Sequence, residues 1–125
     1  MKIDVSLGEL VDKITILAIK LEKISDPEKL ANIRKEYELL HEEMAAAGIT
    51  EAAPEYKGLY QVNRTLWEIE DKIRIKEAEK AFDDEFIELA RSVYFNNDKR
   101  AEIKRGINLK YGSELIEEKS YAPYS

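Results

Sequence analysis

Apolar residues recur every three or four positions along most of the chain, which is the period of an amphipathic α-helix. The first such run opens at Ser6, where Ser6 and Glu9 have the spacing of a capping box. Its apolar positions are Leu7, Leu10, Ile14, Leu17, Leu21 and Ile24. This spacing predicts a helix from Ser6 to about Ile24 with one face turned toward a core.

Two further runs of the same period follow, and each is bounded by residues that start or stop helices. The second helix is predicted to begin at Ser25 or Asp26, with Pro27 in its first turn, and to end at Gly48. A loop containing Pro54 then leads to a third helix that runs to about Lys80. The apolar positions are Leu30, Ile33, Tyr37, Leu40 and Met44 in the second helix, and Leu59, Val62, Leu66, Ile69 and Ile73 in the third.

The fourth helix is predicted to begin at the N-cap Asp83 and to end at about Tyr111, before Gly112. Phe82 and Ile87 flank this N-cap at the spacing of a hydrophobic staple. The remaining residues, at about 113–125, are either a frayed tail or a strap that lies on the bundle or on a neighbouring subunit.

This pattern predicts an all-α fold, an antiparallel four-helix bundle with long helices and a C-terminal tail. The chain has 125 residues, so we expect a single helical domain over 1–125. Regular apolar seams also suit helix pairing between chains, and a homodimer is therefore expected.

The charge balance narrows the classes of partner. The chain holds 20 Lys and Arg against 26 Asp and Glu, a net charge of -6, which argues against nucleic acid or an anionic membrane as the main partner. There is no cysteine, which excludes a disulfide, a thiolate zinc site and a cysteine nucleophile. Acidic and basic residues interrupt the apolar positions near the start, so we expect no signal peptide, no membrane span and a cytoplasmic location.

One position conflicts with the amphipathic pattern of the fourth helix. The inner stripe runs through Phe86, Leu89, Val93, Asn96 or Asn97, Arg100, Ile103 and Ile107. Arg100 therefore lies in line with the core, and a guanidinium stays charged at any relevant pH. It needs a carboxylate partner, for which Asp12, Glu70 and Asp71 are the candidates.

Three explanations of Arg100 remain open at this stage. The sequence Asn96-Asn97-Asp98 breaks the helix and turns Arg100 toward water, or Arg100 forms a structural ion pair that fixes the register of the bundle, or it holds an anionic ligand. The third is favoured by a local excess of basic residues, since residues 91–110 contain six Lys and Arg against two Asp and Glu. Arginine forks match carboxylate and phosphate oxygens, and Tyr94, Asn97 and Asn108 would supply orienting hydrogen bonds.

Established catalytic motifs are missing or incomplete in the sequence. Glu68 and Asp71 have the E-x-x-D spacing of magnesium-dependent helical pyrophosphohydrolases, but Ala46 stands where the second acidic motif needs a glutamate. His41 is the sole histidine, which excludes a histidine metal dyad, and we expect no metal and no cofactor. A helical site of the chorismate-mutase type, with several arginines around a dicarboxylate, is an architectural alternative.

Three segments carry a family resemblance: "GELVDKITIL", "LWEIEDKIR" and "LARSVYFNNDKRAEIKRGIN". Over most of its length the chain resembles an uncharacterised family of small bacterial all-helical proteins. The resemblance implies a setting in lipopolysaccharide or other surface-polysaccharide biosynthesis, and no activity. It draws attention to Asp12, Lys13, Trp67, Glu70, Asp71, Arg74, Arg91, Tyr94, Asn97, Asp98, Arg100 and Lys104.

These observations lead to two functional hypotheses. The first is an accessory or interaction protein that self-associates, with a polar cluster as its register lock and a protein or a small anion as its partner. The second is an enzyme or binding protein for a phosphorylated or carboxylated metabolite, gripped by Arg91, Arg100 and Lys104, with Tyr94 or Glu70 handling a proton. The candidate cluster, whether ligand-binding or structural, is Asp12, Glu70, Asp71, Arg74, Arg91, Tyr94, Asn97, Arg100 and Lys104.

Overall fold

The computed structural model describes residues 1–124 and contains four helices, with no strand in that range. They are α1 (Leu7–Lys23), α2 (Pro27–Ala46), α3 (Pro54–Ala78) and α4 (Asp84–Lys110). The predicted all-α fold with four long helices is confirmed. None of these helices is long and apolar enough to cross a membrane.

The helix starts follow the capping residues of the sequence. The side chains of Ser6, Asp26 and Asp83 accept hydrogen bonds from the backbone at the starts of α1, α2 and α4. Helix α3 has no side-chain cap and begins with Pro54, whose missing N–H would have no helical partner there. Gly48 and Gly112, with positive φ values of 79° and 68°, follow the ends of α2 and α4.

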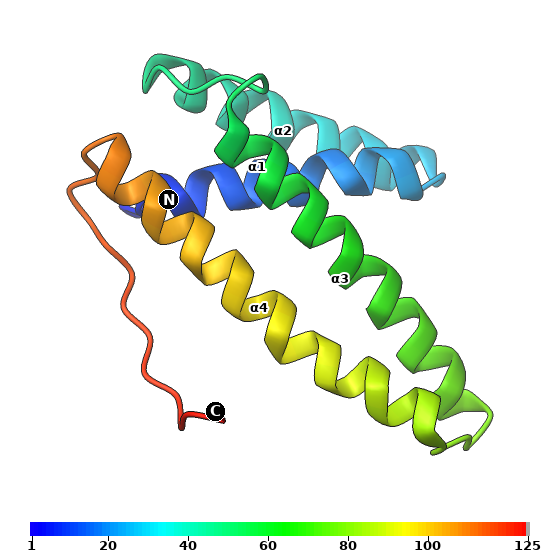
Figure 1. Cartoon of the computed structure of the whole chain (residues 1–125). Helices are drawn as coiled ribbons and strands as arrows, with labels where there is room; N and C mark the ends of the chain where they lie inside the picture. Colours follow the sequence, from blue (N-terminus) through cyan, green and yellow to red (C-terminus); the bar gives the residue numbers. More distant parts are fainter. Residues whose placement is uncertain (125) are drawn as a thin grey trace.

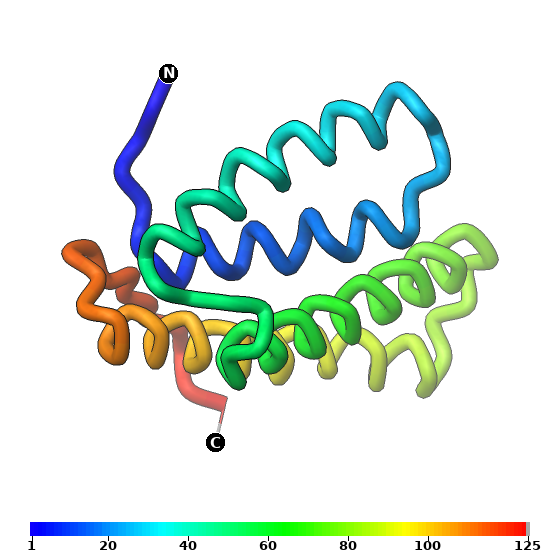
Figure 2. Tube along the Cα trace, turned by 90° about the horizontal axis from the view of Figure 1, so that it is seen from above, coloured from blue at the N-terminus to red at the C-terminus, as the bar shows by residue number. Residues whose placement is uncertain are grey.

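The helices form two antiparallel hairpins, α1–α2 and α3–α4, which cross (Figure 1). Helix α1 packs against all three other helices, whereas α2 has its backbone close to α1 alone. Seen from above, α1 forms the middle layer between α2 and the α3–α4 hairpin (Figure 2). The far half of the α3–α4 hairpin extends beyond this crossing, and we call it the α3–α4 arm (residues 70–92).

The core lies where α1 crosses the other helices. It comprises Val11, Ile14, Met44, Ile49, Tyr56, Leu59 and Ile107. The predicted inner stripe of α4 is fully buried at Ile107, whereas Phe86 and Leu89, on the arm, and Val93, next to it, are half-buried. At the arm's tip, Phe82 packs edge-on against Phe86, and Phe82 and Ile87 both stay more than half exposed.

Helices α1 and α4 approach each other closely at Gly8. A Cβ atom there would lie 2.4 Å from the carbonyl oxygen of Lys104. The backbone N–H of Gly8 also donates to Oδ1 of Asn108 at 2.7 Å. A glycine is therefore required where the two backbones meet.

The C-terminal residues 113–124 leave α4 and run back beside it, and we call them the strap (Figure 1). The hydroxyl of Ser113 accepts a hydrogen bond from the backbone N–H of Leu7 at 3.0 Å. Further along, Glu118 pairs with Arg105 at 2.6 Å, and the Tyr124 ring packs on Phe95. Of the arrangements considered for this segment, the chain adopts the strap on its own bundle.

Candidate functional site

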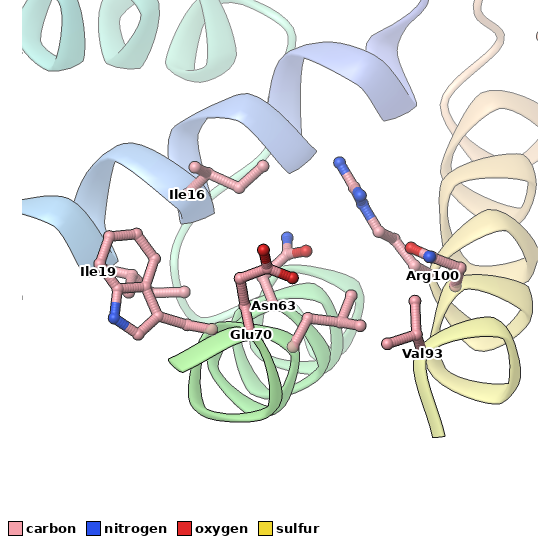
Figure 3. A pocket seen from close by; sticks show the side chains of 9 residues that line it. Ile16, Ile19, Asn63, Glu70, Val93 and Arg100 are labelled. Carbon is pink, nitrogen blue, oxygen red and sulfur yellow. The ribbon is translucent and has the colours of Figure 1, made fainter. Parts of the chain in front are cut away.

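Helix α4 is continuous through Asn96-Asn97-Asp98, so the hypothesis of a break at this point is wrong. The Asn96 amide donates to the backbone carbonyl of Ser92 at 2.8 Å, one turn earlier, and so bonds within the helix without opening it. Arg100 consequently stays on the inner stripe, and its side chain reaches toward α1 (Figure 3).

Arg100 makes a two-pronged ion pair with Asp12 of α1. Its Nε lies 2.8 Å from Oδ1 of Asp12, and its Nη2 lies 2.6 Å from Oδ2. The Asp12 side chain is 1% exposed and that of Arg100 is 29% exposed. The hydrogen bonds that Arg100 donates to Asp12 raise the pKa of Arg100 against the opposing effect of burial. Of the three candidate carboxylates, Asp12 is the partner.

A third helix completes this pair through Asn63 of α3. The Asn63 amide donates to Oδ1 of Asp12 at 2.8 Å and to the hydroxyl of Thr15 at 2.9 Å. The Thr15 hydroxyl in turn donates to the backbone carbonyl of Asp12 at 2.7 Å. The polar lock, as we call Asp12, Thr15, Asn63 and Arg100, thus joins α1, α3 and α4 at one point.

Asn63 and Thr15 were not among the sequence-predicted residues, although a signal for Asn63 exists. Asn63 lies four residues after the buried Leu59 and three before Leu66, so it occupies the inner stripe of α3. It is a polar residue in an apolar stripe, as Arg100 is in α4. Comparing the polar interruptions at Asn63 and Arg100 would have predicted that α3 and α4 lie side by side at this level.

An open pocket of about 270 Å³ lies beside the lock, between α1, α3 and α4. Its walls are mainly apolar, with Ile16, Ile19, Leu66, Trp67 and Val93, and its polar members are Asn63, Glu70, Asn97 and Arg100. Figure 3 shows Asn63 and Glu70 projecting from α3, and Arg100 and Val93 from α4. Trp67, one of the residues to which the resemblance draws attention, lines this pocket and is half-buried.

Glu70 faces the same pocket as Arg100, but the ion pair of Glu70 is with Arg74 of its own helix. The Arg74 Nε lies 2.8 Å from Oε1 of Glu70, and both side chains are exposed. The Glu70 carboxylate is therefore engaged within α3. A direct Arg100–Glu70 or Arg100–Asp71 pair, two of the three alternatives from the sequence, is not the arrangement found.

Lys104 lies one turn after Arg100 and is buried, with 7% of its side chain exposed. Its Nζ is 2.7 Å from a carboxylate oxygen of Glu9 and 3.4 Å from one of Glu117 in the strap. Burial alone would lower the pKa of Lys104, but the hydrogen bond to Glu9 and the nearby carboxylates raise it. Lys104 therefore stays charged between α1 and the strap, outside the pocket beside Arg100.

Four members of the predicted cluster lie away from this centre. Arg91 pairs with Glu88 at 3.1 Å, and the ring of Tyr94 packs on Phe95 with centroids 4.8 Å apart. Asp71 and Arg74 are exposed on α3. The reason is their angular position around the helix axis, since these residues are displaced by about 100° or 200° from the inner stripes of their helices. The structure thus gathers Asp12 and Arg100, places Asn97 and Glu70 on the adjoining pocket, and leaves Asp71, Arg74, Arg91 and Tyr94 outside.

The chemistry of the lock is one of compensated charge. The Asp12 carboxylate and the Arg100 guanidinium neutralise each other, and the amide and hydroxyl that surround them are hydrogen-bonded. Within residues 1–124, no group of three or more His, Asp or Glu is placed to hold a metal ion. Removing one charge of such a pair costs about 3–5 kcal/mol, whereas the intact pair adds little net stability.

Comparison with known proteins gave one match. A family model described as "Family of unknown function (DUF6165)" matches residues 1–125. No curated protein and no solved structure gave a match to the chain.

Proposed function

Since the chain belongs to the DUF6165 family, whose function is unknown, we propose a function from its own geometry. We propose that the protein is a non-catalytic accessory module that pairs with a second copy through the α3–α4 arm, and that the polar lock holds the arm at a fixed angle. Following the resemblance of its sequence segments, we further propose a cytoplasmic role in surface-polysaccharide biosynthesis.

The observation that carries this proposal is the exposure of large apolar residues on the arm. Ile75, Phe82 and Ile87 are 58%, 56% and 51% exposed. They lie where the α3–α4 hairpin extends beyond α1 and α2, so no other helix of the chain covers them (Figure 1). Contiguous exposed apolar patches mark association surfaces, whereas scattered exposed apolar residues are normal, so the proposal requires these three side chains to act as one patch. A second copy would bring an identical arm, as two-fold pairing requires.

The compensated charges of the lock also support a structural role. A catalytic or anion-binding arginine must present its charge to the ligand, whereas two of the three nitrogens of Arg100 are engaged by Asp12. Buried polar groups of this kind can specify how helices align. The lock therefore supports a scaffold function for the crossing of the two hairpins.

Sedimentation equilibrium or light scattering over a range of concentrations tests the proposal. We expect a dimer for the wild type and a monomer for the Ile75→Asp, Ile87→Asp double variant. Dimerisation of the variant would bury the two introduced aspartate charges in the interface without partners, which is unfavourable. Leu39→Asp is the matched control, since Leu39 is 65% exposed on α2, away from the arm. A wild type that is monomeric at high concentration, or an arm variant that remains dimeric, would refute pairing through the arm.

A second candidate function rests on the pocket beside the lock. Its 270 Å³ volume, its apolar walls and the partly exposed Arg100 suit a small phosphorylated or carboxylated metabolite. A thermal-shift panel of phosphate, pyrophosphate, nucleotide sugars and small dicarboxylates tests it. A ligand at about 100 times its dissociation constant adds about 2.7 kcal/mol to the unfolding free energy. A rise in the melting temperature of the wild type that is lost in Arg100→Met supports this candidate function. If no ligand of the panel raises the melting temperature of the wild type, the candidate function is refuted for those compounds.

A further inference from the structure

The strap places two acidic residues on two basic residues of α4. Glu117 lies 3.4 Å from the Nζ of Lys104, and Glu118 lies 2.6 Å from Nη1 of Arg105. Six residues after Glu118, the Tyr124 ring contacts the rings of Tyr94 and Phe95, each with centroids 5.2 Å apart. The Tyr124 hydroxyl also donates to Asp98. The strap is thus held at its acidic pair and at its aromatic end.

The pocket under the acidic pair contains a buried donor that the strap does not satisfy. It has a volume of about 380 Å³ and is lined by Lys104, Arg105 and Asn108 of α4 and by Glu117 and Glu118 of the strap, among others. Asn108 is 1% exposed, and because its Oδ1 accepts from Gly8, the orientation of its amide is fixed. Within the described chain its Nδ2 has no hydrogen-bond partner. Buried amide groups are normally hydrogen-bonded, so the Asn108 amide can donate to a further acceptor oxygen in this pocket.

The strap itself is weakly held. Residues 114–124 are all exposed, and the Glu117 and Glu118 side chains are 39% and 72% exposed. Ion pairs of this exposure contribute little stability. The strap occupies its site mainly because it is tethered to α4, which gives it a high effective concentration. An untethered segment with better contacts can therefore replace it.

We propose that this face of α4 is a docking site for an extended acidic and aromatic segment of a partner protein, and that the strap is a built-in competitor for it. The docking face comprises Tyr94, Phe95, Asp98, Lys104, Arg105 and Asn108. The partner segment carries two adjacent carboxylates followed by an aromatic residue six positions later. A carboxylate that reaches deeper than those of the strap also accepts from the Asn108 amide.

The spacing requires an extended segment. Arg105 and Asp98 are seven residues apart on α4, which is about 10 Å along the helix axis, and Tyr94 is about 6 Å further. Six extended residues span up to about 20 Å, whereas six helical residues span about 9 Å. An extended chain therefore reaches from the basic pair to the aromatic rings, and a helix of the same length does not. A nucleic acid is a poor fit because the chain that carries the pocket's cations has a net charge of -6.

The test uses the full chain with the strap released by substitution. Glu117→Gln, Glu118→Gln and Tyr124→Ala change only exposed side chains, so the released variant keeps the core intact. A synthetic peptide of residues 116–125 in the native sequence is titrated into the ¹⁵N-labelled protein, and amide chemical shifts are followed. We expect saturable shifts at the docking face in the released variant, and at least tenfold weaker binding to the wild type, whose own strap competes.

Matched substitutions separate docking from general charge attraction. In the released variant, Arg105→Glu should abolish the peptide shifts, whereas Arg34→Glu, the same change at an exposed site on α2, should leave them unchanged. A peptide carrying the two Glu→Gln changes should also fail to bind. The proposal is overturned if the released variant shows no saturable shifts, if the wild type binds equally well, or if inorganic phosphate at the same concentration gives the same shifts. This test is independent of pairing through the arm, because that pairing is read from the mass of the assembly.

Discussion

Replacing Arg100 with methionine should destabilise the fold much more than its position at the edge of a pocket suggests. Arg100→Met keeps a long apolar side chain on the inner stripe of α4 and removes only the guanidinium. The Asp12 carboxylate, 1% exposed, then keeps a single side-chain hydrogen bond, from Asn63, and loses its paired counter-charge, so that only the more distant Lys104 acts on it. An uncompensated buried charge is the most costly product of breaking an ion pair.

The magnitude follows from the burial of the two partners. Breaking a buried pair costs about 3–5 kcal/mol, and the 29% exposure of Arg100 puts this pair at the lower end, about 3 kcal/mol. For a chain of this length that corresponds to a fall in the melting temperature of about 10 °C. The double variant Asp12→Asn, Arg100→Met removes both charges and keeps an acceptor for Asn63, so it should be at least about 1 kcal/mol more stable than Arg100→Met.

Urea unfolding followed by circular dichroism at 222 nm and by the fluorescence of Trp67 measures these values. Coincident transitions from the two probes establish that a two-state analysis applies. A loss below about 1 kcal/mol in Arg100→Met would contradict the reasoning, because the carboxylate would then have found water. A double variant that is less stable than the single one would also contradict it.

Three further predictions concern the crossing, the lock and the ends of the helices. Gly8→Ala should destabilise by about 1–3 kcal/mol in urea unfolding because its Cβ would meet the α4 backbone, whereas Gly106→Ala, with no atom within 4 Å of its Cβ, should stabilise by about 0.5–1 kcal/mol. Asn63→Ala should cost about 1–3 kcal/mol because Oδ1 of Asp12 and the hydroxyl of Thr15 each lose a buried hydrogen bond, and equal stability of this variant and the wild type would be inconsistent with the lock. The hydrogen bond from Lys110 lowers the pKa of Glu55 in the folded protein. The ionised Glu55 carboxylate therefore stabilises the fold at pH values above the pKa of Glu55 in the unfolded chain, and this stabilisation is lost as the pH falls through the lower pKa of the folded state. Glu55→Gln should therefore be less stable than the wild type at pH 7, and unfolding measured down to pH 2 should show the two curves converging.

The sequence was sufficient to find the helices, because each one has a three-to-four apolar period and most have a capping residue. Asp26 and Asp83 cap the helices that follow them, as their spacing predicted. The order of the layers could not be obtained in the same way. Periodicity shows that one face of a helix is covered, but it does not identify the covering helix, and so it could not place α1 between α2 and the α3–α4 hairpin.

The candidate site was only partly predictable for a related reason. Arg100 was recognisable because a permanent charge in an apolar stripe is conspicuous, and Asp12 was one of three carboxylates within reach. Choosing among them required the register of α1 against α4, which sequence spacing within one helix does not contain. Asn63 was missed because an uncharged amide interrupts a stripe less visibly than a charge does. Arg91 and Tyr94 were grouped with Arg100 by nearness in sequence, although they project from other faces of α4.

The central place of α1 leads us to expect two cooperative units of unequal stability. Neither the polar lock nor the crossing at Gly8 uses a residue of α2, so the first half of α2, which precedes the core residue Met44, can separate from α1 while both remain intact. The first half of α2 has only half-buried apolar residues, Leu30 and Ile33, to oppose this opening. In native-state hydrogen exchange, the amides of that half should exchange through partial opening, whereas those of α1 should exchange only when the whole chain unfolds.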